Sequence, residues 1–136
     1  MPSPDFRTVV LVNIEENQDA FVVGLSENEA GDGAYLIFQS GLRPPDERDG
    51  LLGLDSYCIL DEDGAVQYGG VTRAVLADAT LTLTLTEAAA EELGVPNAAR
   101  TIVLDVPAED AARLAEGLNR IFTYGTPDKQ PELSGF

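Results

Sequence analysis

Residues 54–86 read LDSYCILDEDGAVQYGGVTRAVLADATLTLTLT, a series of short apolar runs separated by turn signals. The last part, Thr80 to Thr86, alternates threonine and leucine, which places the leucines on one face of a strand and the threonines on the other. Threonine is β-branched, and its stiff side chain favours a pleated strand over a helix. The stretch therefore predicts an antiparallel meander whose leucine face packs against the other elements.

Three turn signals divide this stretch: residues 61–64 (DEDG), residues 69–70 (GG) and residues 77–79 (ADA). Asp-Gly and Gly-Gly supply the positive φ angles that tight hairpins need. The 61–64 segment is similar to the start of a calcium loop, but Val66 and Tyr68 stand where further oxygen ligands are required. We interpret 61–64 as a hairpin turn and predict no metal site.

Four other segments have the β-branched, apolar composition of strands: residues 6–14, 20–25, 34–40 and 101–106. The first two are expected to pair as a hairpin. The third is apolar almost throughout, which favours a central position in the sheet. Residues 41–53 (GLRPPDERDGLLG) form the longest expected loop, because two prolines and the charges oppose regular structure.

Two helices are predicted after the meander. Thr86 is a suitable N-cap for a short helix near 87–93, and Gly94 ends it. Pro107 opens a second helix near 108–122 that carries one apolar stripe. The expected fold class is α+β, a single domain over 1–136 with a mostly antiparallel meander of about seven or eight strands and both helices packed on one face. Residues 1–4 and 125–136 are expected to be flexible tails.

Charge limits the classes of partner. Twenty-four acidic and eight basic residues give the chain a net charge of −16. Such a charge repels nucleic acid and anionic membrane surfaces, so neither is an expected partner, whereas it attracts a basic protein. The alternative that the acidity serves solubility alone remains open. The sequence has no long apolar run, no secretory signal and a single cysteine, and we expect a cytoplasmic protein.

The residue types exclude much of the usual catalytic chemistry. The chain contains no histidine, which removes Ser-His-Asp triads, Cys-His pairs and histidine–metal sites. Cys58 lies in a strand pattern and is expected to be a small buried residue. Because no phosphate-binding glycine motif is present either, we predict no catalytic residues, no cofactor and no enzyme activity. An enzyme that works through two close carboxylates remains the alternative.

Half of the net charge lies between Glu27 and Asp63, where ten acids and two arginines give −8. If the loops that carry these acids share one edge of the sheet, they form a concentrated negative surface, and neighbouring tyrosines can anchor a partner. The candidate partner-binding residues are Glu27, Glu29, Asp32, Asp46, Glu47, Asp49, Asp61, Glu62, Asp63, Tyr35, Tyr57 and Tyr68. The alternative is that the tyrosines are half-buried sheet residues and the acids a solvated rim.

The chain also carries an ordered series of short motifs: FVVGL at 21–25, YLIFQ at 35–39, LDSYC at 54–58, YGGV at 68–71, LTLTLT at 81–86 and AAEELG at 89–94. This series, within residues 7–122, resembles the immunity protein 10 family of bacterial polymorphic toxin systems. The resemblance implies a cytoplasmic protein that is encoded beside a toxin domain and neutralises it by binding. It implies no catalytic residues and assigns no toxin-contacting positions.

Charge and resemblance together lead to one hypothesis. Many toxin domains that attack nucleic acid are basic, and an acidic inhibitor can imitate the phosphate field that they recognise. We therefore expect the acidic loops between residues 27 and 63 to occlude a basic toxin. The alternative from another class is a structural or regulatory module that forms a homodimer through an exposed sheet edge.

Overall fold

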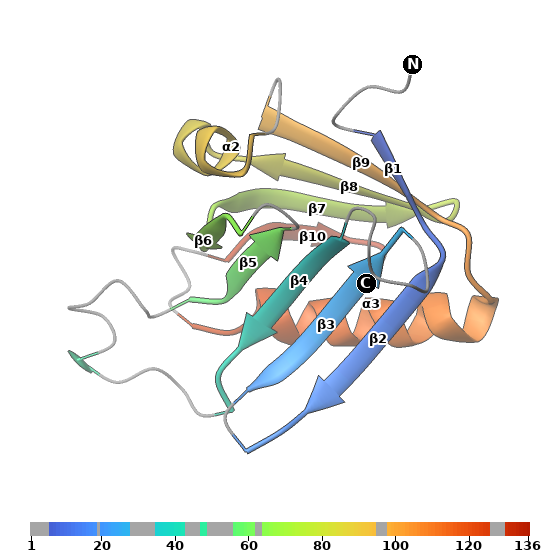
Figure 1. Ribbon diagram of the computed structural model, residues 1–136, viewed down its shortest axis with the longest axis horizontal. Helices are drawn as coiled ribbons and strands as arrows, with labels where there is room; N and C mark the ends of the chain where they lie inside the picture. Colours follow the sequence, from blue (N-terminus) through green and yellow to red (C-terminus); the bar gives the residue numbers. More distant parts are fainter. Residues whose placement is uncertain are drawn as a thin grey trace.

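The computed structural model describes residues 6–18, 20–27, 35–42, 47–48, 56–61, 64–94, 98–125 and 130–136, and its strands form two five-stranded sheets (Figure 1). Sheet A has the order β1 (Phe6–Val9), β9 (Ala99–Leu104), β8 (Thr80–Leu85), β7 (Val71–Ala77) and β10 (Glu132–Ser134). Sheet B has the order β2 (Leu11–Glu16), β3 (Phe21–Ser26), β4 (Tyr35–Ser40), β5 (Cys58–Asp61) and β6 (Val66–Tyr68).

Sheet B is antiparallel throughout, whereas sheet A has a parallel strand at each edge. β1 pairs with β9 and β10 pairs with β7 in parallel, and β7, β8 and β9 are joined by antiparallel ladders. With the two helices, this arrangement confirms the α+β class and the mainly antiparallel pairing. The strands nevertheless divide into two sheets, not the single meander that the sequence predicts.

The threonine–leucine repeat forms β8 as predicted. Leu81, Leu83 and Leu85 are buried, and the intervening threonines are half-buried or exposed. β8 pairs with β7 through a two-residue turn in which Asp78 and Ala79 both have positive φ, at 53° and 57°. Positive φ at both central positions is the hairpin geometry that follows the right-handed twist of the strands.

The two described helices begin and end where the sequence places them: α2 spans Glu87–Leu93 and α3 spans Ala108–Phe122. The Thr86 hydroxyl accepts a hydrogen bond of 3.1 Å from the Ala89 N–H, and Gly94 ends α2 in the left-handed conformation. Such a cap satisfies one backbone donor that a helix leaves open at its start.

The chain passes between the sheets at two points that the sequence does not identify. Residues 6–14, expected as one strand, divide at Val10 into β1 of sheet A and β2 of sheet B. The Gly69-Gly70 pair does not close a hairpin but carries the chain from β6 in sheet B to β7 in sheet A. Both glycines have positive φ, and a Cβ on Gly70 would lie 2.5 Å from the Ala89 Cβ. Close packing of α2 on this crossover therefore requires glycine.

The core lies between the two sheets and α3. Helix α3 packs on β2, β3 and β4, and Gly117 lets it approach closely, because a Cβ there would lie 3.0 Å from a Val23 methyl carbon. The Phe122 ring meets the rings of Phe38 and Tyr57 edge to face, with centroids 5.7 and 5.2 Å apart. These side chains are fully buried, so α3 fastens one face of sheet B.

The C-terminal segment is part of the fold and not a loose tail over its whole length. Residues 132–134 form β10, which pairs with Arg73, Ala74 and Val75 of β7. The Phe136 ring also packs edge to face on Phe122 at a centroid distance of 6.3 Å. Residues 1–4, the other expected tail, lie outside the described residues.

Candidate partner-binding surface

Strand alternation gives sheet B two faces of different kinds. The inner face carries the buried side chains of β3 and β4 and is covered by α3. The opposite face is defined here as the outer face of sheet B, and the strand register assigns to it Leu11, Asn13, Glu15, Val22, Gly24, Ser26, Tyr35, Ile37, Gln39, Cys58, Leu60, Val66 and Tyr68. Figure 1 shows sheet B with α3 behind it, and neither described helix lies over the near face.

The outer face of sheet B is mainly aliphatic and aromatic. Ile37, Leu60 and Val66 are neighbours across three strands, and Gln39, Cys58 and Tyr68 form the next row. Glu15 is the only charged side chain assigned to this face among the described residues. An antiparallel sheet with one solvated face usually alternates apolar and polar residues, so this face departs from the ordinary pattern.

Three apolar side chains of this face are strongly exposed. Val66 is 41% exposed, Tyr68 45% and Leu11 38%. Val66 and Tyr68 lie on β6, the edge strand, and Leu11 lies on β2 at the opposite edge. An exposed apolar patch on a soluble protein commonly marks a surface for another molecule.

The corresponding outer face of sheet A is composed differently. On its four strands β7 to β10 it carries Arg73, Val75, Ala77, Thr80, Thr82, Thr84, Ala99, Thr101, Val103, Glu132 and Ser134. Threonine recurs on its two central strands, β8 and β9, and Arg73 and Glu132 are register partners of opposite charge. Its side chains are those expected of a sheet face in water.

The predicted tyrosines separate into two groups. Tyr35 and Tyr68 belong to the outer face of sheet B, whereas Tyr57 is completely buried against Phe122. The Tyr57 hydroxyl accepts a hydrogen bond of 3.0 Å from the Val71 N–H. Burial raises the pKa of Tyr57 to about 12, and the bond from Val71 lowers it by less. Tyr57 thus joins sheet B to the first residue of β7 and is assigned to the core, not to a contact surface.

Asp61 also has a structural role. It is 4% exposed, and its carboxylate accepts a hydrogen bond of 3.0 Å from the Ala65 N–H while its carbonyl accepts one from Gly64. These bonds close the β5–β6 hairpin, which confirms the turn predicted at 61–64. Among the other predicted acids, Glu27 and Glu47 are exposed, and Glu29, Asp32, Asp46, Asp49, Glu62 and Asp63 lie outside the described residues.

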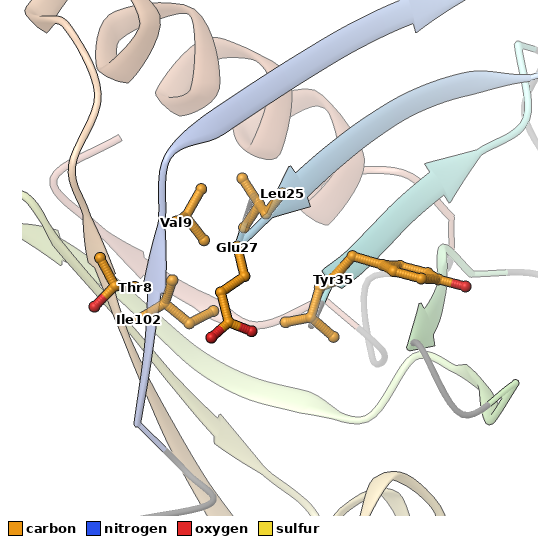
Figure 2. Close-up of a pocket in the computed structure, with 7 residues that line it drawn as sticks. Thr8, Val9, Leu25, Glu27, Tyr35 and Ile102 are labelled. Atoms are coloured by element: carbon orange, nitrogen blue, oxygen red, sulfur yellow. The ribbon is translucent and has the colours of Figure 1, made fainter. Parts of the chain in front are cut away.

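Glu27 lies at a junction of the two sheets. With Thr8, Val9, Leu25, Tyr35, Leu36 and Ile102 it lines a cavity of about 10 Å³, which is room for about one water molecule. Figure 2 shows the Glu27 carboxylate directed toward Ile102 and the Tyr35 ring directed away from the cavity. A cavity of this size admits no organic ligand.

A wider, open depression of about 430 Å³ adjoins Tyr68 at the crossover between the sheets. Its lining is neutral: Gln67, Tyr68, Gly69, Gly70, Val71, Thr72, Thr86 and Gln130. Side chains of this kind provide no acid, base or metal ligand set. The depression therefore extends the apolar surface around Tyr68 with a concave, uncharged region.

Cys58 is buried, as predicted. It is 4% exposed between its register partners Gln39 and Tyr68. Burial raises the pKa of the Cys58 thiol, and a hydrogen bond with the Gln39 side chain lowers it by less. A thiol held protonated in this way is a poor nucleophile.

The described residues were also compared with the requirements of a metal site and of a membrane-spanning helix. They contain no group of three or more histidine, cysteine, aspartate or glutamate side chains that could hold a metal ion. Neither of the helices that they form has the length and apolar character required to cross a membrane.

The aliphatic members of the outer face were not identified from the sequence as site residues. Ile37, Leu60 and Val66 were assigned only to strands, because charge and aromatic content guided the selection of candidates. A usable signal was present in residues 35–40 (YLIFQS), where apolar side chains occupy both phases of the alternation. Such a strand is apolar on both faces, and the second face needs its own explanation.

Comparison with known proteins assigns the chain to a family. The family model described as immunity protein 10 matches residues 8–112, more than half of the 136-residue chain. The match runs from β1 into the first part of α3 and includes all five strands of sheet B. No curated protein and no solved structure gives a significant match. Immunity proteins neutralise toxins and are generally not catalytic, and this chain belongs to the immunity protein 10 family.

Proposed function

We propose that this protein binds a cognate bacterial toxin domain and neutralises it by covering its active site or an essential surface, without catalysis. The observation that carries the proposal is the family match over residues 8–112. The toxin is expected to be a basic protein that acts in the cytoplasm, where the immunity protein meets it.

The charge of the chain supports this mode of action. A net charge of −16 accelerates encounter with a basic partner, because long-range attraction raises the association rate at low ionic strength. The exposed carboxylates of Glu27 and Glu47 are described members of the 27–63 acidic segment. Their contribution is to steering, while the lifetime of the complex depends on the buried centre of the interface.

Co-expression with the toxin-like domain encoded beside this gene tests the proposal. The expected result is rescue of growth and co-purification of a stable complex. A catalytically inactive toxin variant serves as the control for expression, since its growth does not depend on the immunity protein. An active, well-folded toxin domain that still kills cells containing this protein would contradict the proposal.

A further inference from the structure

We propose that the outer face of sheet B is the docking surface for the toxin domain, with its centre at Val66 and Tyr68. The inference rests on the proposed function and adds the contact surface and the chemistry of the partner. The occupant is a protein of net positive charge that presents an apolar patch to this face.

The first argument is the composition of the face. Ile37, Leu60 and Val66 form an aliphatic row across three strands, and no described helix lies over it. The fold does not require this exposure, because the Phe38 and Phe122 rings pack on the opposite side of the sheet. Apolar side chains left in contact with water gain from burial against a partner.

The second argument is the distribution of charge around the face. Glu15 is the only charged side chain of the described residues that the register assigns to it. Exposed Glu27 follows β3, and Glu16 at the end of β2 pairs with Arg120 of α3 at 2.7 Å. Protein interfaces commonly combine an apolar centre that is poor in charge with a polar, solvated rim. The outer face of sheet B has such a charge-poor centre, and the chain as a whole carries a large excess of acidic over basic residues.

The same charge decides between occupants. Two copies of this chain, each at −16, repel one another, so a second copy is a poor occupant of the face. A basic partner is attracted to the net negative charge of the chain and can bury the apolar centre. Complementary charge therefore favours a heterologous protein over self-association.

Tyr68 is the strongest single anchor on this face. It is 45% exposed, and it borders the neutral depression of about 430 Å³ at the sheet crossover. Tyrosine provides a large contact area with few rotatable bonds, and anchors of this type cluster at interface centres. Val66, two residues earlier on the same face, enlarges the contact.

The test compares two double variants in binding to the toxin domain. Val66→Ser with Tyr68→Ala removes exposed apolar contacts from the outer face of sheet B. Val75→Ser with Thr82→Ala is the matched control on the outer face of sheet A, where these two residues are register partners. Circular dichroism and thermal unfolding of each variant establish that it is folded before binding is measured.

We expect the sheet B variant to weaken toxin binding by roughly 10- to 100-fold, mainly through faster dissociation, and the control to change it less than about threefold. If the sheet B variant does not fold, Val66→Arg and the matched Thr82→Arg replace the two double variants, with the same expected contrast. The added cation on β6 opposes both burial and a basic partner.

Each other outcome has a distinct meaning. A wild-type complex that both variants leave unchanged overturns the docking surface but not the proposed function. Equal weakening by both variants overturns the assignment to sheet B. Failure of the wild-type protein to bind or rescue removes the proposed function and the inference with it. A wild-type homodimer that the sheet B variant dissociates identifies a second copy as the occupant and overturns the inference.

Discussion

The two sheets present different outer faces. On sheet A the outer-face residues of β8 and β9 are four threonines, at positions 80, 82, 84 and 101, together with Ala99 and Val103. On sheet B the equivalent positions of β4 and β5 carry Ile37 and Leu60. Both sheets bury one leucine- or phenylalanine-rich face in the same core, so the difference does not arise from the needs of folding.

If the outer face of sheet B binds the toxin, as proposed, stability and binding belong to different faces of one small domain. The inner faces and α3 bury the large apolar side chains whose truncation is expected to destabilise the protein most. The outer face of sheet A is rich in threonine. The outer face of sheet B carries more exposed apolar side chains, which the proposal assigns to contact with a partner.

The largest expected effect comes from the covered side of sheet B. Phe122→Ala is expected to lower the free energy of unfolding by about 3–5 kcal/mol, because the ring is fully buried among Phe38, Tyr57 and Phe136. Tyr68→Ala on the uncovered side is expected to lower it by less than about 1 kcal/mol. Urea unfolding measures both, and similar losses would break the distinction between the two sides.

The second prediction compares two tyrosines that the sequence treats alike. Tyr57→Phe leaves the Val71 N–H without its acceptor in a buried site and is expected to lower the free energy of unfolding by about 1–3 kcal/mol. Tyr68→Phe is expected to change it by less than about 0.5 kcal/mol. Equal losses of unfolding free energy in chemical denaturation would mean that the hydrogen bond between Tyr57 and Val71 does not stabilise the fold.

The pH dependence of Tyr57→Phe sharpens this comparison. The pKa of Tyr57 is raised in the folded state, from 10.0 to about 12, so folding favours the protonated phenol. The contribution of the protonated Tyr57 phenol to stability is complete below pH 10 and is lost as the pH rises through about 12. A pKa shift of this size corresponds to roughly 3 kcal/mol in the free energy of unfolding. The difference in stability between wild type and Tyr57→Phe should therefore narrow between pH 10 and 12.

The third prediction exchanges the characters of the two outer faces. Leu60→Thr with Val66→Thr gives sheet B a threonine face, and Thr82→Val with Thr84→Val gives sheet A an apolar one. Each pair is expected to change the free energy of unfolding by about 1 kcal/mol or less, because strand preference spans about that range. Binding of a hydrophobic fluorescent dye should fall for the first pair and rise for the second. No change in dye binding would mean that the apolar side chains of sheet B are not accessible.

The smallest expected effect belongs to three acids of the 27–63 acidic segment. Changing Asp46, Glu47 and Asp49 together to the neutral amides is expected to slow toxin association by a factor of about 2–10 at low salt and to alter dissociation little. Stopped-flow measurements at two ionic strengths separate the two rates. Unchanged association and salt dependence would show that these acids do not steer the partner.

The sequence predicted the local structure well and the division of the strands poorly. The α2 cap at Thr86, the end of α2 at Gly94 and the Asp78-Ala79 turn follow from short-range rules of capping and φ preference. The separation of β1 from β2 at Val10 was not predicted, because β1 finds its partner in β9, more than ninety residues later. The parallel pairing of β10 with β7 also joins residues far apart in the chain, such as Glu132 and Arg73.

The candidate surface shows the same limit. Acidity and the tyrosines could be read from composition, but alternation alone cannot tell Tyr57 from Tyr68, since each lies in a strand-like run bounded by turns. Their environments differ because α3 covers one face of sheet B and places Phe122 beside Tyr57. The aliphatic row of Ile37, Leu60 and Val66 emerges only when three strands separated by loops are brought into register.

The sequence by itself determined the α+β class, both helices, the absence of histidine chemistry and the net charge of −16, because these depend on residue type and short-range spacing. The tertiary structure alone decided that the strands form two sheets, that β10 belongs to one of them and that no described helix lies over the apolar outer face of sheet B. Those features depend on contacts between residues far apart in the chain, where each local pattern is compatible with several partners.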